Sequence, residues 1–371
     1  MKNYFIIIFL VVSFLMLLCC ARNNQENIQS KSLNQQMIGM TENPTATAFS
    51  KPPQEMTMNE IQALYVDMQA NTLKAASIGL NSLALGVSWD EMEPSPGVYN
   101  FSSLQDTITR SKLANRSLEL FNVRVIDTTD KPLPTDLLNL PMDSEETKQR
   151  AKELFQALAP VLTDGNVKRV EFGNEIDIYF LYHPEEAMNF AWLFWLTKQE
   201  FKKIMPNVPF GMSVTFEQIK KPEIQAALKP ILQLGDFVAF TYYPINERFV
   251  VRNPYTAISD IQTMRKIAEG FGFSEAILQE VGYPSSRTCR SSERMQKNFY
   301  KYALREIKAN ADFFPFACFF IMCDYPQWFV DQFGGYYGID DKAFLEYLKT
   351  VGTIDENGNP KDSWNFLKKN L

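Results

Sequence analysis

Short apolar runs alternate with longer segments of helical periodicity along most of this chain, and this alternation limits the folds open to it. Seven strand-like runs are separated by segments whose apolar residues are spaced to line one helix face. Strands that alternate with helices form parallel sheets, and about eight repeats favour a closed barrel over an open doubly wound sheet. No glycine fingerprint for a dinucleotide or a phosphate follows any of the runs, which argues against the open sheet. We therefore predict an α/β fold, a (β/α)8 TIM barrel.

The predicted elements follow one another in regular order. The predicted strands span 82–89, 118–126, 167–175, 208–216, 237–243, 276–282 and 314–324, and a first strand placed within 45–50 brings the total to eight. The predicted helices span 58–78, 101–115, 144–162, 184–205, 258–270 and 292–309. A chain of 371 residues is long for one domain, but barrels of this type reach that length.

The first 20 residues have the composition of an export signal. Lys2 precedes an apolar core from Phe5 to Leu18, which is short for a membrane span and ends at Cys19 and Cys20. A cysteine directly after such a core is typical of a bacterial lipoprotein. Cys20 is the better candidate for lipidation, because cleavage before it leaves the small Cys19 at the preceding position. Plain cleavage and a retained anchor are the alternatives.

Two further segments complete the predicted domain organisation. Residues 21–53 are rich in Asn, Gln, Ser and Thr and almost free of aromatic residues, so we predict a flexible polar tether. Residues 54–371 would form the catalytic barrel. We expect an exported protein, anchored through lipid in the membrane of a bacterial cell envelope.

Charge and residue counts exclude several classes of function. A net charge of −6 and a pI near 5.2 argue against a nucleic-acid partner, and no obligate protein partner is evident. His183 is the only histidine, so a His-rich metal site is excluded, and a Ser-His-Asp triad would have to use His183. We expect no metal and no cofactor. Outside the signal, Cys289, Cys318 and Cys323 allow at most one disulfide, and Cys318 and Cys323 should face opposite sides of one strand.

Two carboxylates stand at the ends of predicted strands. Glu175 ends the run Val170–Glu175, and Glu280 lies near the end of Ala276–Gly282. Active sites of (β/α)8 barrels lie at the carboxyl ends of the strands, and strands four and seven face each other across the ring. Glycosidic cleavage needs such a pair, one acid to protonate the leaving oxygen and one carboxylate to attack the anomeric carbon. The alternative for either residue is a surface carboxylate after a strand.

Several motifs recur in the order found in a known clan. They are Trp89 with Glu93–Phe101, Gly173-Asn174-Glu175, Tyr242-Tyr243-Pro244, Glu280–Pro284, and Asp355–Lys361 with Trp364. With these motifs the chain, from about residue 60 to 371, resembles the retaining glycoside hydrolases with (β/α)8 barrels that include cellulases, β-mannanases and β-galactanases.

The resemblance implies a role for each matching residue. Glu175 would be the acid/base and Glu280 the nucleophile, while Asn174 would hydrogen-bond the sugar 2-hydroxyl. Tyr243 would keep Glu280 ionised by donating a hydrogen bond, and Tyr242 is the fallback for that role. The pKa of Glu175 would be raised by burial and by the charge of Glu280.

One feature departs from the clan, which usually places a tryptophan at the end of strand eight. Here Phe320 or Trp328 would take that role, or the sugar subsite differs. Aromatic rings in the loops after the strands, together with Trp89, are candidates for stacking on sugars. The loop rings are Tyr179, Phe180, Tyr182, Tyr283, Tyr325, Trp328, Tyr336 and Tyr337.

Together the residues indicate a retaining β-glycoside hydrolase that acts on a β-linked poly- or oligosaccharide. One alternative is a non-catalytic carbohydrate-binding or adhesion lipoprotein on the same barrel. A second is transglycosylation, which uses the same covalent intermediate with a sugar acceptor in place of water.

Overall fold

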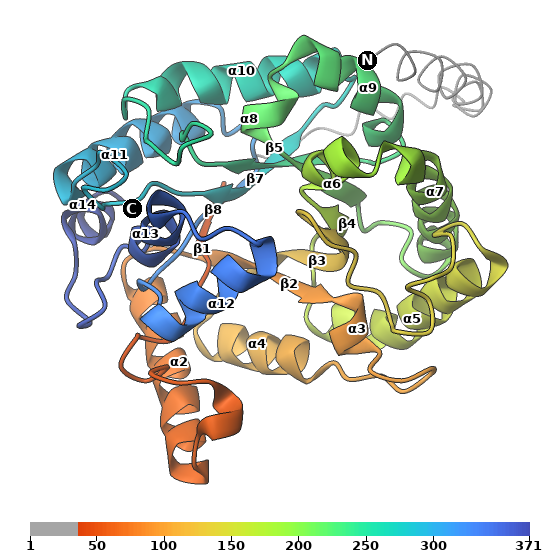
Figure 1. The fold of residues 1–371 in the computed structure, drawn as a ribbon, viewed down its shortest axis with the longest axis horizontal. Helices are drawn as coiled ribbons and strands as arrows, with labels where there is room; N and C mark the ends of the chain where they lie inside the picture. Colours follow the sequence, from red (N-terminus) through yellow and green to blue (C-terminus); the bar gives the residue numbers. More distant parts are fainter. Residues whose placement is uncertain (1–35) are drawn as a thin grey trace.

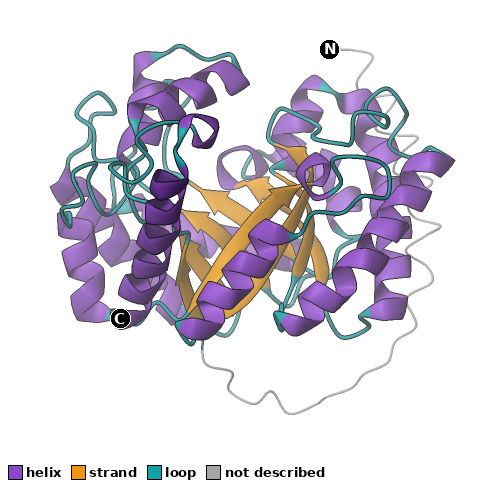
Figure 2. Ribbon diagram, turned by 90° about the horizontal axis from the view of Figure 1, so that it is seen from below, coloured by secondary structure: helices purple, strands orange, loops and turns teal. Residues whose placement is uncertain are grey.

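The computed structural model describes residues 36–371 and confirms the predicted (β/α)8 barrel. Eight parallel strands pair in sequence order, and β1 closes the ring against β8. The strands stand at the centre with the helices around them (Figures 1 and 2). The strands are β1 (Met37–Met40), β2 (Ser82–Ser88), β3 (Ser117–Asp127), β4 (Val170–Asn174), β5 (Phe210–Thr215), β6 (Val238–Tyr242), β7 (Ala276–Val281) and β8 (Phe316–Phe319).

Two of the helices that cover the barrel begin at capping residues. Thr57 and Glu60 form a capping box at the start of α2, and Ser144 caps α5. The helices in the first half of the chain are α2 (Met58–Ser77), α3 (Trp89–Met92), α4 (Ser102–Leu113), α5 (Glu145–Asp164), α6 (Ile176–Tyr182) and α7 (Ala187–Ile204). The later helices are α8 (Phe216–Ile219), α9 (Pro222–Leu232), α10 (Thr256–Gly270), α11 (Glu293–Ala309), α12 (Gln327–Tyr337), α13 (Lys342–Thr350) and α14 (Asp362–Asn370); short 3-10 turns lie at Pro53–Glu55 and Pro184–Glu186.

Two apolar layers hold the barrel together. Between strands and helices, Phe172 of β4 packs against Phe155, Phe194 and Phe210, with ring centroids 5.8 to 6.3 Å apart. Side chains alternate along a strand, so the neighbouring positions point into the barrel. A smaller buried cluster there contains Leu120, Phe237, Ala239, Ile277, Phe316 and Cys318. This inner layer closes the lower part of the barrel.

The next inward-facing layer, towards the carboxyl ends of the strands, is polar. Side chains of one strand face the same side at every second residue, so three polar residues lie one layer above the apolar cluster: Asn122, Ser213 and Gln279. Glu171 also faces inward, because its neighbours Val170 and Phe172 on β4 face outward. All four are buried. Polar groups with no access to water need partners, so this layer must bond internally and to the groups above it. It forms the floor of the candidate site.

The first strand differs from the prediction. It lies at Met37–Met40, where it pairs with Phe316–Phe319 of β8, whereas residues 46–50 form turns. A four-residue run in a polar segment gives little periodicity to detect. The barrel therefore begins within the segment predicted to be a tether. The predicted signal peptide and the lipidation site Cys20 lie outside the described residues.

Other boundaries are close to prediction, with two exceptions. Strand β8 covers only Phe316–Phe319 of the predicted 314–324. The helices α6, α9, α12, α13 and α14 and the four-residue helices α3 and α8 were not predicted. Cys289, Cys318 and Cys323 are buried free thiols. Cys323 lies beyond β8, so the prediction that it shares one strand with Cys318 is wrong. None of the helices within 36–371 combines the length and the apolar composition needed to cross a lipid bilayer.

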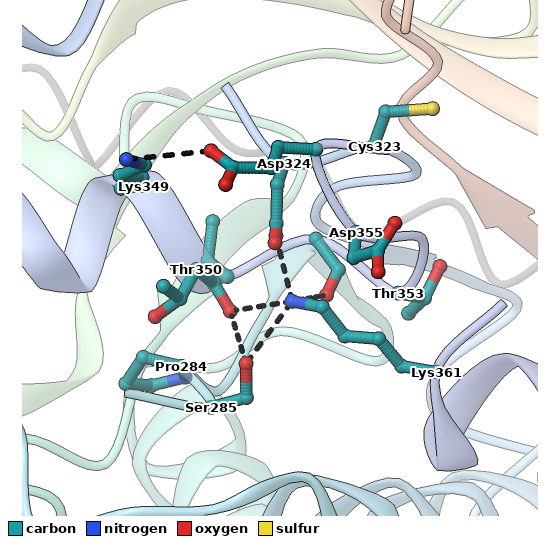
Figure 3. Close-up of polar contacts among 12 residues, drawn as sticks. Pro284, Ser285, Cys323, Asp324, Lys349, Thr350, Thr353, Asp355 and Lys361 are labelled. Atoms are coloured by element: carbon teal, nitrogen blue, oxygen red, sulfur yellow. Dashed lines mark hydrogen bonds and ion pairs between the residues drawn. The ribbon is translucent and has the colours of Figure 1, made fainter. Parts of the chain in front are cut away.

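A buried lysine ties the C-terminal segment to the barrel (Figure 3). Lys361 is 4% exposed, and its Nζ lies 2.7 Å from Asp324 Oδ1, beyond the end of β8. The same ammonium group donates to Ser285 Oγ at 3.0 Å and to the carbonyls of Thr350 and Gly352 at 3.2 and 2.9 Å. Buried charges persist when paired and fully hydrogen-bonded, as here. The contacts join the loop after β7, the end of α13 and the C-terminal segment.

Candidate active site

Glu175 is held at the junction of β4 and α6. It is the N-terminal capping residue of α6 and has a left-handed backbone conformation, with φ 47°, which is uncommon for a residue other than glycine. Its N–H donates to Ser213 Oγ at 3.0 Å. Two residues later, buried Asp177 accepts hydrogen bonds from the N–H and the hydroxyl of Thr215 at 2.8 and 2.5 Å. These bonds fix the turn that aims Glu175 over the barrel.

The Glu175 carboxyl group accepts two hydroxyl hydrogen bonds. Thr241 of β6 donates to Oε1 at 2.6 Å, and Thr128, directly after β3, donates to Oε2 at 2.8 Å. The carboxyl group is thus held between the ends of β3 and β6, on either side of β4 in the barrel.

Glu280 has the partner that the resemblance implies. Tyr243, the residue after β6, donates its hydroxyl to Glu280 Oε2 at 2.5 Å. Tyr242, the fallback, points the other way: it is fully buried and its hydroxyl bonds Asp260 at 2.8 Å.

The two carboxyl groups influence each other electrostatically. Burial and then the charge of Glu175 raise the pKa of Glu280 to about 7, although Tyr243 and Arg124 act in the opposite direction. Burial also raises the pKa of Glu175, against its hydrogen bonds from Thr241 and Thr128. The neighbouring charge that most raises the pKa of Glu175 is that of Asp127, whereas the resemblance implies Glu280 for this effect. The Tyr243 bond is thus present as predicted, but it does not lower the pKa of Glu280 below its ordinary value.

Arg124 supplies positive charge beside this pair. It is ion-paired with Asp127, with Nη1 3.1 Å from Oδ2, and its charge lowers the pKa of both Glu175 and Glu280. Its guanidinium group lies over Gly86 of β2, where a Cβ on residue 86 would stand 2.5 Å from Nε. Only glycine leaves room for Arg124 there.

Asn174 is held directly beside Glu175 by four side chains. Its Nδ2 donates to Asp127 Oδ1 at 2.9 Å. Its Oδ1 lies 2.9 Å from Gln279 Nε2, 3.2 Å from Ser213 Oγ and 3.3 Å from Asn122 Nδ2. The amide orientation is thereby fixed.

Helices α12 and α13 bring phenol rings to the same site, and α12 lies in front of the barrel strands in Figure 1. The Tyr347 ring of α13 packs edge-on against Tyr243, with centroids 5.5 Å apart. Burial and then the charges of Glu280 and Glu175 raise the pKa of Tyr347. Burial and then Glu175 and Asp127 raise the pKa of Tyr337 in α12, and burial and then Glu280 raise that of Tyr325. These phenols stay protonated and can donate to sugar hydroxyls.

Two aromatic residues that were predicted to contact sugar are buried in other contacts. Trp89 is 0% exposed and donates from Nε1 to Glu93 Oε2 at 2.8 Å. Tyr283 is also 0% exposed, stacks on Phe299 and donates to the Arg252 carbonyl at 2.7 Å. Neither offers a ring face to a ligand, because packing and a buried partner consume both sides. A sugar-contacting role for these two is therefore not supported.

The structure also locates Phe320 and Trp328, the two candidates to replace the tryptophan that the clan usually has at the end of strand eight. Trp328 is half-buried in α12, where Nε1 donates to the Phe49 carbonyl at 2.7 Å and the ring packs on Phe49. Phe320 lies edge-on to Tyr243, with centroids 5.8 Å apart. Of the two residues considered, Phe320 is the one that adjoins the Glu280 side of the pair.

One group within 36–371 could place three metal-ligand atoms together. His183, Glu185 and Glu186 have such atoms within 4.8 Å of one another. Glu186 already accepts bonds from Lys131, at 3.1 Å, and from Tyr179, also at 3.1 Å. The group lies beyond α6, and Glu185 lies 3.7 Å from His183 Nδ1 within the group itself.

Sequence reasoning missed Thr128, Thr241, Asp127, Arg124 and Tyr347. Thr241 has a signal in hindsight, since it lies two residues before Tyr243 and so on the same face of β6. The others depend on strand register and on the path of α12 and α13, which periodicity does not encode.

Searches against protein-family models and against curated proteins gave no match to this sequence. The fold, in contrast, matches many solved structures. A family 5, subfamily 18 glycoside hydrolase from Streptomyces cattleya, in complex with GlcNAc, superposes with a TM-score of 0.67 at 13% identity, over 91% of this chain and 80% of that one.

Two other glycoside hydrolases are similar. The exo-β-1,4-mannosidase Op5Man5 from Opitutaceae bacterium strain TAV5 gives a TM-score of 0.65 at 14% identity, over 90% of this chain and 59% of that one. A family 39 enzyme from the gut symbiont Bacteroides cellulosilyticus WH2 gives 0.60 at 13% identity, over 91% and 64%. The chain thus spans less than two thirds of either protein. At these identities the matches establish the fold alone, a (β/α)8 barrel like that of these family 5 and family 39 glycoside hydrolases.

Proposed function

We propose that this protein is a retaining β-glycoside hydrolase. The observation that carries the proposal is the pair of buried carboxyl groups at the ends of β4 and β7. Burial raises the pKa of both Glu175 and Glu280, the charge of Glu175 raises that of Glu280 further, and Tyr243 donates a hydrogen bond to Glu280. Two carboxyl groups with one proton between them at neutral pH are what double displacement requires.

In the first step the protonated Glu175 gives its proton to the glycosidic oxygen while Glu280 attacks the anomeric carbon. The aglycone leaves, and a covalent glycosyl ester forms on Glu280. In the second step the ionised Glu175 takes a proton from water, which attacks the same carbon and releases Glu280. Two inversions retain the configuration. Tyr243 donates to Glu280, and the second hydrogen of Asn174 Nδ2 is placed for the sugar 2-hydroxyl.

The substrate we propose is a β-linked glycan. Structures of similar fold hold GlcNAc, or Manβ1-4GlcNAc in a second Streptomyces cattleya enzyme structure, and one is an exo-β-1,4-mannosidase. β-Mannosides and β-linked N-acetylglucosamine conjugates are therefore the first compounds to assay. No cofactor takes part in the proposed steps.

Azide rescue separates the two carboxyl roles. With an aryl β-glycoside whose leaving group needs no acid, Glu175→Ala should be accelerated by azide and give the β-glycosyl azide. Glu280→Ala should give the α-glycosyl azide, because azide then enters where the nucleophile stood. The reverse stereochemistry would exchange the roles. Glycan binding without turnover in the wild type would favour the non-catalytic binding protein.

We also propose export and acylation at Cys20, which the sequence from Lys2 to Cys20 supports. Cys20→Ser should abolish incorporation of a fatty-acid probe, and Cys19→Ser should retain it. Labelling that survives Cys20→Ser would contradict the proposed site.

A further inference from the structure

Glu171 is a buried acid that the proposed steps do not use. It is 0% exposed and faces the inside of the barrel below Asn174. One terminal atom of the Gln279 amide lies 2.8 and 2.9 Å from the two Glu171 carboxyl oxygens, and the other lies 2.9 Å from Asn174 Oδ1. Gln279 directly precedes Glu280, so this contact joins the barrel interior to the candidate site.

The identity of the Gln279 atoms follows from the neighbouring amide. Asp127 is ion-paired with Arg124, and an ionised carboxylate only accepts hydrogen bonds, so Asn174 must present its NH2 group to Asp127. Asn174 Oδ1 then faces Gln279, which must donate to it. Turning the Gln279 amide over would set two oxygens 2.9 Å apart. Gln279 Oε1 therefore faces Glu171.

Of the two Glu171 oxygens, the nearer lies 2.8 Å from Gln279 Oε1, and a proton on it turns a contact between two acceptors into a hydrogen bond. The proton must come from Glu171, since the amide oxygen carries none. Burial, which is complete, raises the pKa of Glu171 well above its usual value, and the charges of Glu280 and Glu175 act in the same direction. Ser213 and Arg124 oppose this shift.

We propose that Glu171 is kept as a neutral acid and acts as a positioning residue, which through Gln279 turns the Asn174 amide so that its NH2 group faces the sugar 2-hydroxyl. The inference rests on the proposed function and extends it. Gln279, Ser213 and Asn122 surround Asn174 Oδ1, whereas one Nδ2 hydrogen remains free of protein partners after the bond to Asp127. An ionised Glu171 could only accept hydrogen bonds, so the Gln279 NH2 group would have to face it. The Gln279 and Asn174 amides would then both take the opposite orientation.

A substrate comparison at carbon 2 tests the positioning role. An aryl β-mannoside and the corresponding β-glucoside differ only in the configuration of the 2-hydroxyl. Without that hydroxyl both become the same 2-deoxy glycoside. Gln279→Leu should lower kcat/KM by about 10- to 100-fold on the preferred hydroxylated substrate, because the contact strengthens in the transition state. Its effect on the 2-deoxy compound should stay within about twofold. Equal losses on both would show a merely structural role and overturn the inference.

Variants of Glu171 test its charge state. Glu171→Gln still donates to Gln279 Oε1, so it should keep the preference for the 2-hydroxyl and leave both limbs of the pH profile unmoved, whereas Glu171→Leu should behave like Gln279→Leu. If Glu171 were ionised, Glu171→Gln would remove a negative charge and move the alkaline limb to lower pH.

A direct readout needs no turnover. Infrared difference spectra of wild type and Glu171→Gln at pH 7 should contain a carboxylic acid C=O band that belongs to Glu171. Its absence would overturn the inference even in an active enzyme, whereas a wild type that turns over no glycoside would sink the proposed function instead. Glu119→Gln is the matched control: Glu119 is a buried acid at the other end of the barrel, ion-paired with Arg169. It should cost stability and leave the 2-hydroxyl preference unchanged.

Discussion

Tyr242 and Tyr243 are adjacent in sequence, yet a strand points them to opposite sides. Tyr243→Phe removes the hydroxyl that favours the ionised form of Glu280. The pKa of Glu280 should rise, so the acidic limb of kcat/KM, below which the nucleophile is protonated, should move up by about one pH unit.

Tyr242→Phe is the matched control for this experiment. It loses a bond to Asp260 outside the barrel, so it should lower stability and leave the pH profile in place. A profile that Tyr243→Phe does not move would contradict the assigned role.

Gly86 has no side chain and therefore leaves room for the Arg124 guanidinium group. Gly86→Ala would put a methyl group where the Arg124 guanidinium lies, 2.5 Å from Nε, and the flexible arginine would have to move. Loss of that positive charge should raise the pKa of both carboxyl groups, shift the acidic limb upward and lower kcat/KM at neutral pH on the order of tenfold. Gly270→Ala meets no atom within 4 Å and serves as control. Equal profiles for the two variants would refute the assignment.

Sequence reasoning found those site residues that lie at or beside the ends of predicted strands. Glu175 and Glu280 follow from their positions at strand ends, whereas the roles of Asn174 and Tyr243 came from the family resemblance. Trp89 was assigned to substrate, but the nearby Glu93, which accepts from Trp89, Arg150 and Gly97, draws it into a buried network. Whether a loop residue packs inward depends on such partners, and a single sequence does not reveal them.

At the scale of elements, α12 and α13 form an excursion of the chain after β8, residues 327–350, which contacts loops and strand ends on two sides. Phe344 of α13 packs on Phe249 in the loop after β6, with centroids 4.8 Å apart, and on Tyr337, 5.7 Å away. On the other side the Tyr336 hydroxyl donates to the carbonyl of Asp127, the last residue of β3, at 3.4 Å. The excursion thus spans the mouth of the barrel and carries Tyr337 and Tyr347 to the carboxyl pair.

Weaker packing of this excursion should impair substrate binding more than it slows the chemical step. Phe344→Ala removes its packing on Phe249, so we expect faster hydrogen exchange in 327–350 and a rise in KM of about tenfold, with kcat changed less. Phe271→Ala is a control of equal burial, since both rings are 5% exposed and Phe271 lies away from the site. If KM rises equally in both variants, the excursion has no special part in binding.

Elements were predictable where they were long and periodic, as for α2, α5 and α11. Strand β1 has four residues and is defined by its partner β8, with Gly39 allowing the approach to Ser82. Helices α12 and α13 lie in an aromatic stretch that packs against loops from distant parts of the chain. Tertiary contacts, not local pattern, decide such segments.

At the scale of the whole molecule, the ion pair of Lys361 and Asp324 fastens the C-terminal segment (Figure 3). Lys361→Met leaves Asp324 buried without its partner and should cost about 3–5 kcal/mol in urea unfolding at pH 7. The double variant Lys361→Met with Asp324→Leu removes both charges and should recover much of that loss. Lys349→Met breaks a more exposed pair with Glu356 and should cost less than about 1 kcal/mol. A Lys361→Met cost no larger than that of Lys349→Met would contradict the role of the buried pair.

Trapping of the covalent intermediate is the decisive experiment for the proposed mechanism. The protein is incubated with a panel of activated 2-deoxy-2-fluoro β-glycosides, and its intact mass and peptides are then measured. We predict one added glycosyl unit, located on Glu280, absent in Glu280→Gln and released slowly by water or a sugar acceptor. An adduct on another residue, or hydrolysis with inverted configuration and no adduct, would contradict the retaining mechanism assigned to Glu175 and Glu280.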